Sequence, residues 1–165
     1  MAYTLENTER VIHNIIIKLL ESDDLMKCLK YDVKSALEED DLTDGEKMIL
    51  AMGNPQYARI LQMPVNPDTV EENRVELRVY IDKIIPDNIH LADINISLQV
   101  VVSNNLWMLD NGIQRPLKMI SEVLRVLNGE LVEGLGRLYF QRPIQFVTYN
   151  KSYSGYILTP DVRMG

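Results

Sequence analysis

The chain has 165 residues, of which 46% are hydrophobic, and its formal net charge is −7. This length and apolar content suit one hydrophobic core, so we expect residues 1–165 to form a single domain. No basic stripe is present to neutralise phosphates, which argues against sequence-specific nucleic-acid binding. The single cysteine, Cys28, excludes an internal disulfide, and no apolar run approaches the roughly 20 residues that cross a bilayer. We therefore expect no membrane partner.

The first predicted element is an amphipathic helix. Asn7 and Thr8 are expected to cap it. Apolar residues then recur at three- and four-residue spacing, which is typical of one helix face. These residues are Val11, Ile12, Ile15, Ile16, Leu19 and Leu20. Core packing is the expected role of this face, and contact with a neighbouring subunit is the alternative.

The negative charge is concentrated in the next part of the chain. Ten acidic residues and three lysines lie between Glu21 and Glu46, so the rest of the chain is close to neutral. We expect short helices with acidic connections here, one of them running from Asp32 to Leu37.

A further helix is predicted after Thr43, because Thr43 and Glu46 have the spacing of a capping box, and Gly53 ends it. Prolines keep residues 56–69 extended and without internal hydrogen bonds. We expect this segment to be an exposed arm that contacts a neighbouring subunit. The interface residues predicted in it are Pro64, Val65 and Pro67.

From Arg74 onward the apolar residues alternate, which predicts half-buried strands over 74–82 and 93–102. A turn at 86–88 should join them into an antiparallel hairpin. A helix from Pro116 to Leu127 is predicted to pack on this sheet. Further short strands are predicted over 136–140, 144–149 and 155–158.

This order of elements predicts an α+β fold. N-terminal helices precede a mainly antiparallel sheet, which one central amphipathic helix covers. The expected parts of the single domain are a helical part (1–53), an extended proline-containing loop (54–73), a sheet-plus-helix core (74–158) and a tail (159–165).

The acidic run 40–45 resembles the start of a calcium-binding loop. The third and twelfth positions, however, are Leu42 and Ala51, where calcium needs oxygen ligands. An acidic linker that carries a helix cap is the expected role, and no metal site is predicted.

Other candidate motifs also lack required residues. The pair Gly134 and Gly136 lacks the third glycine of a dinucleotide-binding turn and predicts a bulge or close backbone approach. His13 and His90 lie on different elements, and His13 is expected on a helix surface. Cys28 is expected to be a small buried hydrophobe. We predict no catalytic residue, no cofactor and no enzyme activity.

Six of the eleven aromatic residues lie between positions 139 and 156. Core or sheet-face packing is the expected role of such a cluster. A partner-facing edge that accepts a neighbouring strand is the alternative. The aromatic residues assigned to a candidate interface are Trp107, Tyr153 and Tyr156.

Six segments of the second half share a family likeness. They are Arg74–Tyr80, Asn105–Gly112, Arg115–Leu117, Leu127–Gly129, Gly134–Phe140 and Tyr153–Tyr156. Together they resemble small structural proteins of tailed bacteriophages, of the neck and tail-terminator (head–tail connector) kind. The likeness spans residues 74–158 and rests on turns, caps and a strand–helix junction. It does not place the helical region before Gly53.

The resemblance implies a non-enzymatic virion protein, made in the bacterial cytoplasm, that forms a ring, expected to be hexameric. Such a ring caps the tail tube or joins it to the head. Its implied partners are copies of itself and neighbouring neck and tail-tube proteins, with at most passive contact to phage DNA. The alternatives are a head-completion or stopper protein, an unrelated interaction domain, and a small enzyme or ligand-binding domain with a dispersed site.

Overall fold

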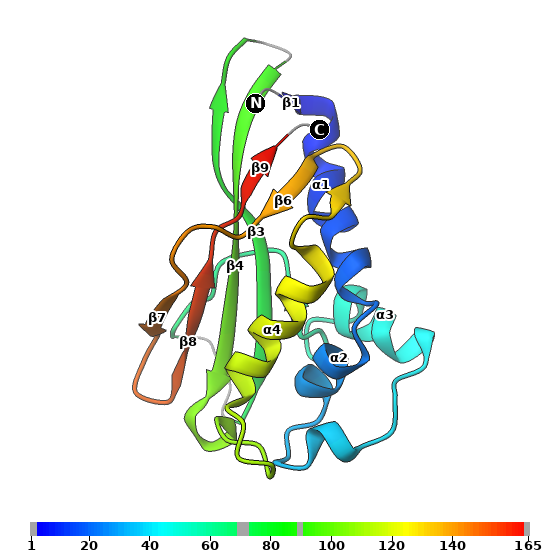
Figure 1. The fold of residues 1–165 in the computed structure, drawn as a ribbon, viewed down its shortest axis with the longest axis vertical. Helices are drawn as coiled ribbons and strands as arrows, with labels where there is room; N and C mark the ends of the chain where they lie inside the picture. Colours follow the sequence, from blue (N-terminus) through cyan, green and yellow to red (C-terminus); the bar gives the residue numbers. More distant parts are fainter. Residues whose placement is uncertain (1–2, 69–72, 89–90, 164–165) are drawn as a thin grey trace.

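Helices cover one face of a mainly antiparallel sheet in the computed structural model, which describes residues 3–68, 73–88 and 91–163 (Figure 1). The α-helices are α1 (Leu5–Leu19), α2 (Asp23–Lys30), α3 (Asp44–Met52) and α4 (Arg115–Leu127). Two short 3₁₀ turns are η1 (Ala36–Glu38) and η2 (Asn104–Leu106). Helix α4 lies across the middle of the sheet, as its apolar stripe predicts.

The main sheet has the strand order β2-β3-β4-β8-β7, and β1 pairs with the far end of β4. Its strands are β1 (Tyr3–Thr4), β2 (Ile60–Leu61), β3 (Val75–Pro86), β4 (Leu91–Ser103), β7 (Gln145–Thr148) and β8 (Tyr153–Leu158). Strand β2 runs parallel to β3, and the other pairs are antiparallel. A small antiparallel sheet contains β5 (Leu131–Val132), β6 (Gly136–Tyr139) and β9 (Asp161–Arg163), so the predicted tail includes a strand. The predicted α+β class is confirmed.

The core lies between the helices and the inner face of the β3–β4 hairpin. Val79 is opposite Leu98 in this hairpin, and both side chains are fully buried. The apolar face of α1 is buried here too, which confirms its predicted core role. Exposed His13 lies on the outer side of α1, as predicted.

The start of the helical region differs from the sequence prediction. Helix α1 begins at Leu5, directly after β1, so Asn7 and Thr8 lie inside it and do not cap it. Short helices were predicted in this region, but the bounds of α2 were not. Ser22 caps it, because its Oγ accepts a hydrogen bond from the Leu25 amide at 3.1 Å.

The predicted helix from Asp32 to Leu37 is also wrong. Asp32 instead holds the guanidinium of Arg59 in a two-pronged ion pair, with an Nη2–Oδ2 distance of 2.9 Å. The chain makes only the short turn η1 before the acidic connection. Helix α3 begins as predicted, because Thr43 and Glu46 form both hydrogen bonds of a capping box.

Residues 54–68, the strap, add β2 to the edge of the main sheet beside β3 and then reach the outer face of the sheet at Val65. The Val65 amide donates a hydrogen bond to Gln99 Oε1 at 2.9 Å. Gln99 alternates along β4 with Leu98, which faces the core, so its side chain lies on the face opposite the helices. The predicted exposure of residues 56–69 is confirmed for residues 62–64 and 66–68, whereas Ala58 and Ile60 are buried and β2 belongs to the sheet, so this part is corrected. Thr69 lies outside the described residues.

The strap explains a buried polar network on β3. Glu76 forms ion pairs with Arg74 at 2.7 Å and with Arg78 at 2.6 Å, and all three residues are buried. Arg74 also donates to carbonyls of the strap, namely those of Pro55, Gln56 and Ala58. The prediction that this polar face of β3 is exposed is therefore wrong, because the strap covers it.

Arg115, the first residue of α4, is fully buried. Its Nε donates to the Leu106 carbonyl at 2.8 Å. The two terminal nitrogens donate to carbonyls at and beyond the end of α2, namely those of Cys28, Tyr31 and Val33. A cation at a helix C-terminus is favoured by the helix dipole, so this guanidinium ties α2 to the start of α4.

A second link between α2 and α4 runs through Glu122. Its carboxylate accepts a hydrogen bond from Ser22 Oγ at 2.7 Å and pairs with Lys118 at 3.0 Å and Arg125 at 2.8 Å. Burial by itself raises the pKa of Glu122, but the hydrogen bonds from Ser22, Arg125 and Lys118 outweigh burial and lower that pKa to about 2.

We predict that Arg115→Lys lowers the free energy of unfolding by about 3 kcal/mol, because one ammonium group cannot satisfy four separated carbonyls. Urea denaturation measures the loss. Arg125→Lys, on an exposed part of the same helix, is the matched control and should lose less than about 1 kcal/mol. Equal losses for the two variants would contradict the role given to Arg115.

We also predict an acid-sensitive contribution from Glu122. A folded pKa below the ordinary value of 4.5 stabilises the fold above pH 4.5, and this stabilisation is lost as pH falls toward 2. Glu122→Gln should remove roughly 3 kcal/mol at pH 7 and less at pH 3. Urea titrations at both pH values measure the difference. A loss that does not depend on pH would contradict the prediction.

Candidate functional site

Three aromatic rings from separate parts of the chain meet at the surface beside α4. They are Trp107, which follows η2, Phe146 on β7 and Tyr156 on β8. The ring centroids lie 6.0 Å apart for Trp107 and Phe146, 6.3 Å for Trp107 and Tyr156, and 5.7 Å for Phe146 and Tyr156. Two of these contacts have the edge-to-face geometry that aromatic rings favour. Phe146 nevertheless remains 56% exposed.

Strand register and one loop produce this cluster. Phe146 is directly opposite Tyr156 in the β7–β8 pair, so the two rings share one face of the sheet. The indole Nε1 of Trp107 donates to Gln114 Oε1 at 3.1 Å, which fixes the ring over the start of α4. The β4–β8 contact also needs Gly155, because a Cβ there would lie 1.6 Å from the carbonyl oxygen of Val100.

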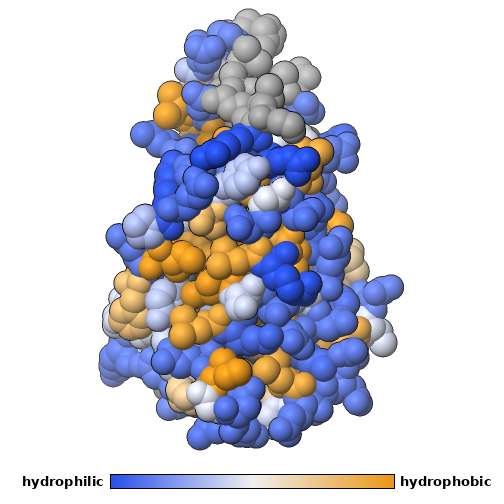
Figure 2. All heavy atoms as spheres, in the orientation of Figure 1, coloured by the Kyte–Doolittle hydropathy of each residue, from blue (hydrophilic) through white to orange (hydrophobic). Residues whose placement is uncertain are grey.

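The three rings belong to a larger apolar area, the aromatic surface. It consists of Trp107, Leu117, Leu124, Phe140, Ile144, Phe146 and Tyr156, all of which are exposed or partly exposed. Figure 2 shows hydrophobic residues gathered over α4 and toward β7 and β8. Strand β7 ends the strand order of the main sheet, so within the described residues its outer edge is open. The aromatic surface therefore reaches an unpaired sheet edge, which is a place where chains associate.

The structure separates the six residues predicted to form an interface. Trp107 and Tyr156 lie together in the aromatic surface. Tyr153 is 1% exposed, and its hydroxyl accepts a hydrogen bond from the Arg74 amide, so its assignment to an interface is corrected to a core role. The remaining three residues, Pro64, Val65 and Pro67, lie in the strap and are exposed or partly exposed.

Sequence reasoning missed several members of the aromatic surface. Leu117 and Leu124 lie on the helix that was predicted to pack on the sheet, although Leu117 is 45% exposed. This helix is apolar over a wider arc than the face that contacts the sheet, and that width is the signal that was available. Phe140 and Phe146 lie in the aromatic cluster at 139–156, for which a partner-facing edge was only the alternative; the exposure of Phe146 depends on β7 being the last strand of the sheet.

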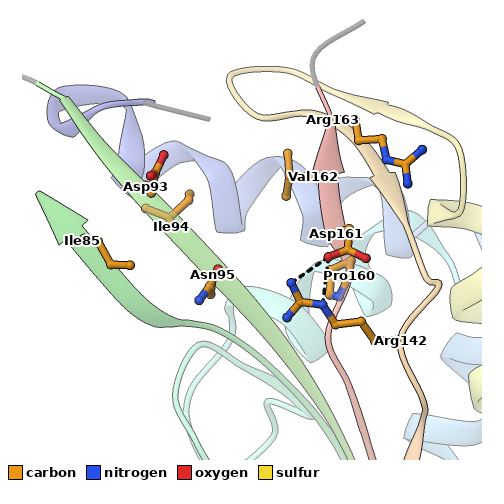
Figure 3. Close-up of a pocket in the computed structure, with 9 residues that line it drawn as sticks. All are labelled: Ile85, Asp93, Ile94, Asn95, Arg142, Pro160, Asp161, Val162 and Arg163. Carbon is orange, nitrogen blue, oxygen red and sulfur yellow. Dashed lines mark hydrogen bonds and ion pairs between the residues drawn. The ribbon is translucent and has the colours of Figure 1, made fainter. Parts of the chain in front are cut away.

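A polar cleft of about 490 Å³ lies between the β3–β4 hairpin and β9 (Figure 3). Arg142 forms an ion pair with Asp161 at 2.7 Å. The guanidinium of Arg163 lies 5.0 Å from the centre of the Tyr139 ring and donates to Gln141 Oε1 at 2.7 Å. These charged groups are engaged with neighbouring side chains of the same chain, which is typical of structural contacts.

The remaining candidate groups have structural surroundings. Burial raises the pKa of the Cys28 thiol to about 11, which disfavours the reactive thiolate. Gly134 and Gly136 adopt positive φ angles of 79° and 114° at the turn into β6, a conformation that favours glycine. No atom lies within 4 Å of a Cβ placed on Gly134, so the predicted close backbone approach is not found there. Within the described ranges no three metal-binding side chains are grouped, and no helix is long and apolar enough to cross a membrane. His90 lies outside the described residues.

The chain belongs to the YomW family, whose sequence model matches residues 22–162. That name is the name of a Bacillus phage-derived protein. No curated protein and no solved structure matches the chain. The match begins at Ser22, the cap of α2, and extends into β9, so it includes α2 and α3 of the helical region that the resemblance to neck proteins left out, but not α1.

We predict that Phe146→Ser lowers the free energy of unfolding by less than about 1 kcal/mol, because more than half of this side chain is already in water. The fluorescence of Trp107, the single tryptophan, should shift to longer wavelength as its neighbouring ring is lost. Urea denaturation and emission spectra measure both effects.

Leu158→Ala is the matched comparison, since Leu158 on β8 is fully buried. It should cost about 2–5 kcal/mol. A comparable loss for Phe146→Ser would identify Phe146 as a core residue and would remove it from the aromatic surface.

Proposed function

We propose that this phage-associated chain is a non-enzymatic structural subunit of the virion, which assembles with copies of itself into a ring. The ring would act as a tail terminator or neck connector between head and tail. The observation that supports this most directly is the aromatic surface, which exposes a packed group of rings beside an open sheet edge.

The physical argument concerns the cost of exposing apolar side chains to water. An exposed apolar area that includes a tryptophan and a tyrosine has the composition of protein–protein interfaces. Trp107, Phe146 and Tyr156 already pack against one another, so a partner meets a surface that is largely organised. A preorganised surface loses less conformational entropy on binding.

The net charge of the chain supports the proposal that its contact with DNA is passive. The chain is acidic overall, with a net charge of −7, and it would repel a duplex more than hold it. A ring through which DNA passes at ejection requires a lumen that does not bind the duplex. The partners under this proposal are further copies of the chain and adjacent neck or tail-tube proteins.

The alternative within the same class is a head-completion or stopper protein of the neck. Binding of the protein to purified tails or to purified heads of the phage distinguishes the two assignments. A tail terminator should bind the free ends of tails, whereas a head-completion protein should bind DNA-filled heads. Negative-stain electron microscopy of the labelled protein with each part gives the answer, and binding to neither part would count against both.

We predict that the wild-type protein forms a closed oligomer whose mass, measured by light scattering across a concentration series, is a multiple of 19.0 kDa. Phe146→Ser should weaken this association by at least about tenfold, which corresponds to roughly 1.4 kcal/mol. Leu131→Ser is the matched control, because Leu131 is 53% exposed on β5 and lies outside the aromatic surface.

Circular dichroism of each variant verifies that it is folded. A wild-type protein that stays monomeric at every concentration, and that is absent from purified particles by mass spectrometry, would overturn the proposal. Equal weakening by both substitutions would show that the aromatic surface is not the contact.

A further inference from the structure

The polar cleft of Figure 3 lies between two strand edges that face each other. Strand β4 pairs with β3 along one side. On its other side it pairs with β1 at Leu91 and Ala92, and with β8 from Leu98 onward. Among the described residues no strand pairs with the part of that side in between. Strand β9 is the last strand of the small sheet, and its open side faces the open side of β4 across the cleft.

A proline opens this cleft. Continuing the β4–β8 register two residues beyond Leu158 would place Pro160 opposite Ile96. Proline has no N–H to donate to the ladder, so the pairing of β8 with β4 ends here. The chain then turns away from β4 and forms β9, which pairs with β6 instead. Figure 3 shows β9 diverging from β4, and the space between them is the cleft of about 490 Å³.

The register of β4 shows which of its backbone groups point into the cleft. The amide of Ser103 donates to the Arg74 carbonyl, on the side of β3. The amide of Asn104 donates to the Ser152 carbonyl, on the side of β8. Alternate residues of a strand direct their N–H and C=O groups to opposite sides, so the even-numbered residues of β4 point away from β3. Ile94, which lines the cleft, therefore directs both of its backbone groups into it.

The same reasoning applies to β9. Leu138 of β6 forms backbone hydrogen bonds with residues 129–130, on the side away from β9. The next residue, Tyr139, therefore directs its backbone groups toward Asp161 of β9, its partner in register. Val162 alternates with Asp161, so its N–H and C=O point away from β6 and into the cleft, which Val162 lines. Backbone donors and acceptors thus converge on the cleft from both sides.

The side chains around the cleft differ between its two faces. Ile94 is buried and Val162 packs against the core, so apolar side chains lie on the helix side. Asn95 and Asp161 alternate with these residues along their strands and lie on the outer face. Arg142 and Asp161 form an ion pair with each other (Figure 3). Recognition of a ligand therefore falls to the backbone of β4 and β9.

We infer that the cleft binds an extended polypeptide segment of another protein, which adds a strand between β4 and β9. A strand offers N–H and C=O groups along both of its sides, as two facing strand edges require. The added strand joins the two sheets into one. Its side chains alternate, with apolar groups toward Ile94 and Val162 and polar groups toward Asn95 and Asp161. The cleft volume lies within the range of ligand-binding sites.

The donor of this strand is a different protein and not a second copy of the chain. Among the described residues, the stretch 62–68 is extended and lies outside the helices and strands. The Val65 amide and the Pro67 carbonyl already hydrogen-bond to side chains of their own fold. Pro64 and Pro67 have no N–H to donate to a ladder. The inference thus goes beyond the proposed self-association and adds a second kind of contact.

Peptide binding to the full chain tests the inference. The probe is a fluorescein-labelled hexapeptide of alternating threonine and valine, and fluorescence anisotropy measures its dissociation constant. Val162→Pro removes the β9 amide that faces the cleft and leaves the pairing with β6 in place. It should raise the dissociation constant about tenfold, because about one backbone hydrogen bond is lost. The same peptide with N-methylated valines cannot donate along one side and should also bind more weakly.

Thr148→Pro is the matched control, at the open edge of β7. The neighbouring Tyr149 amide donates to the Tyr153 carbonyl, so the Thr148 amide points away from β8. Proline is tolerated at such an edge, and this variant should bind the peptide like the wild type. Circular dichroism verifies that both variants are folded. Equal weakening in the two variants, or no saturable binding to the wild type, would overturn the inference.

Photochemical cross-linking in purified particles tests the donor. The photoreactive residue p-benzoylphenylalanine replaces Asn95, on the outer face beside the cleft, and mass spectrometry identifies the attached peptide. A cross-link to an extended segment of a different particle protein is the expected result. A cross-link to a second copy of the chain would overturn the choice of donor. Cross-links confined to the subunit itself would overturn the added strand.

The outcomes separate this inference from the proposed function. Phe146→Ser should weaken self-association and leave peptide binding unchanged, because Phe146 does not line the cleft. A wild-type protein that assembles but binds no peptide would overturn the cleft assignment while the assembly function stands. A protein that binds the peptide, yet stays monomeric and is absent from particles, would remove the proposed function and support the cleft.

Discussion

The guanidinium of Arg115 joins α2 to α4, the helix that contributes to the aromatic surface. It is fully buried at the start of α4 and donates to backbone carbonyls at the end of η2 and at the end of α2. A buried charge is costly unless hydrogen bonds surround it, so α2 and α4 must meet here in one arrangement. The same helix then carries Leu117 and Leu124 to the aromatic surface, while α2 contacts α3. The place of α4 in the aromatic surface thus depends on one buried cation.

On the other face of the sheet, a buried arginine likewise donates hydrogen bonds to backbone carbonyls, here those of the strap. Arg74 binds strap carbonyls on one side and Glu76 on the other, so the segment is attached to the sheet through a buried ionic network. Chain segments without regular structure carry backbone polar groups that need partners when they are covered. The partners here come from β3 and β4, whose polar residues face the strap. The strap therefore covers this part of the outer face, whereas the aromatic surface lies on the helix side of the sheet.

The sequence allowed prediction of the elements whose signals are local. The β3–β4 hairpin follows from strict alternation, α4 from its apolar stripe and Pro116, and α3 from its capping box. The bounds of α2 were missed, although Ser22 with two following acids is a usable cap signal. Trp107 and Tyr156 were assigned to an interface, but the course of the strap and the full extent of the aromatic surface were not predictable in this way. They depend on which strand ends the sheet and on which segment crosses its face, and these are long-range choices that short patterns do not encode.

The family match includes the elements that position the aromatic surface. Residues 22–162 include Arg115, the strap, α3 and every residue of the aromatic surface. Arg115 ties α2 to α4, and Arg74 ties the strap to β3, so these elements are held in a fixed relation. The proposed ring would require such rigidity, because variation in the angle between neighbouring subunits would prevent closure.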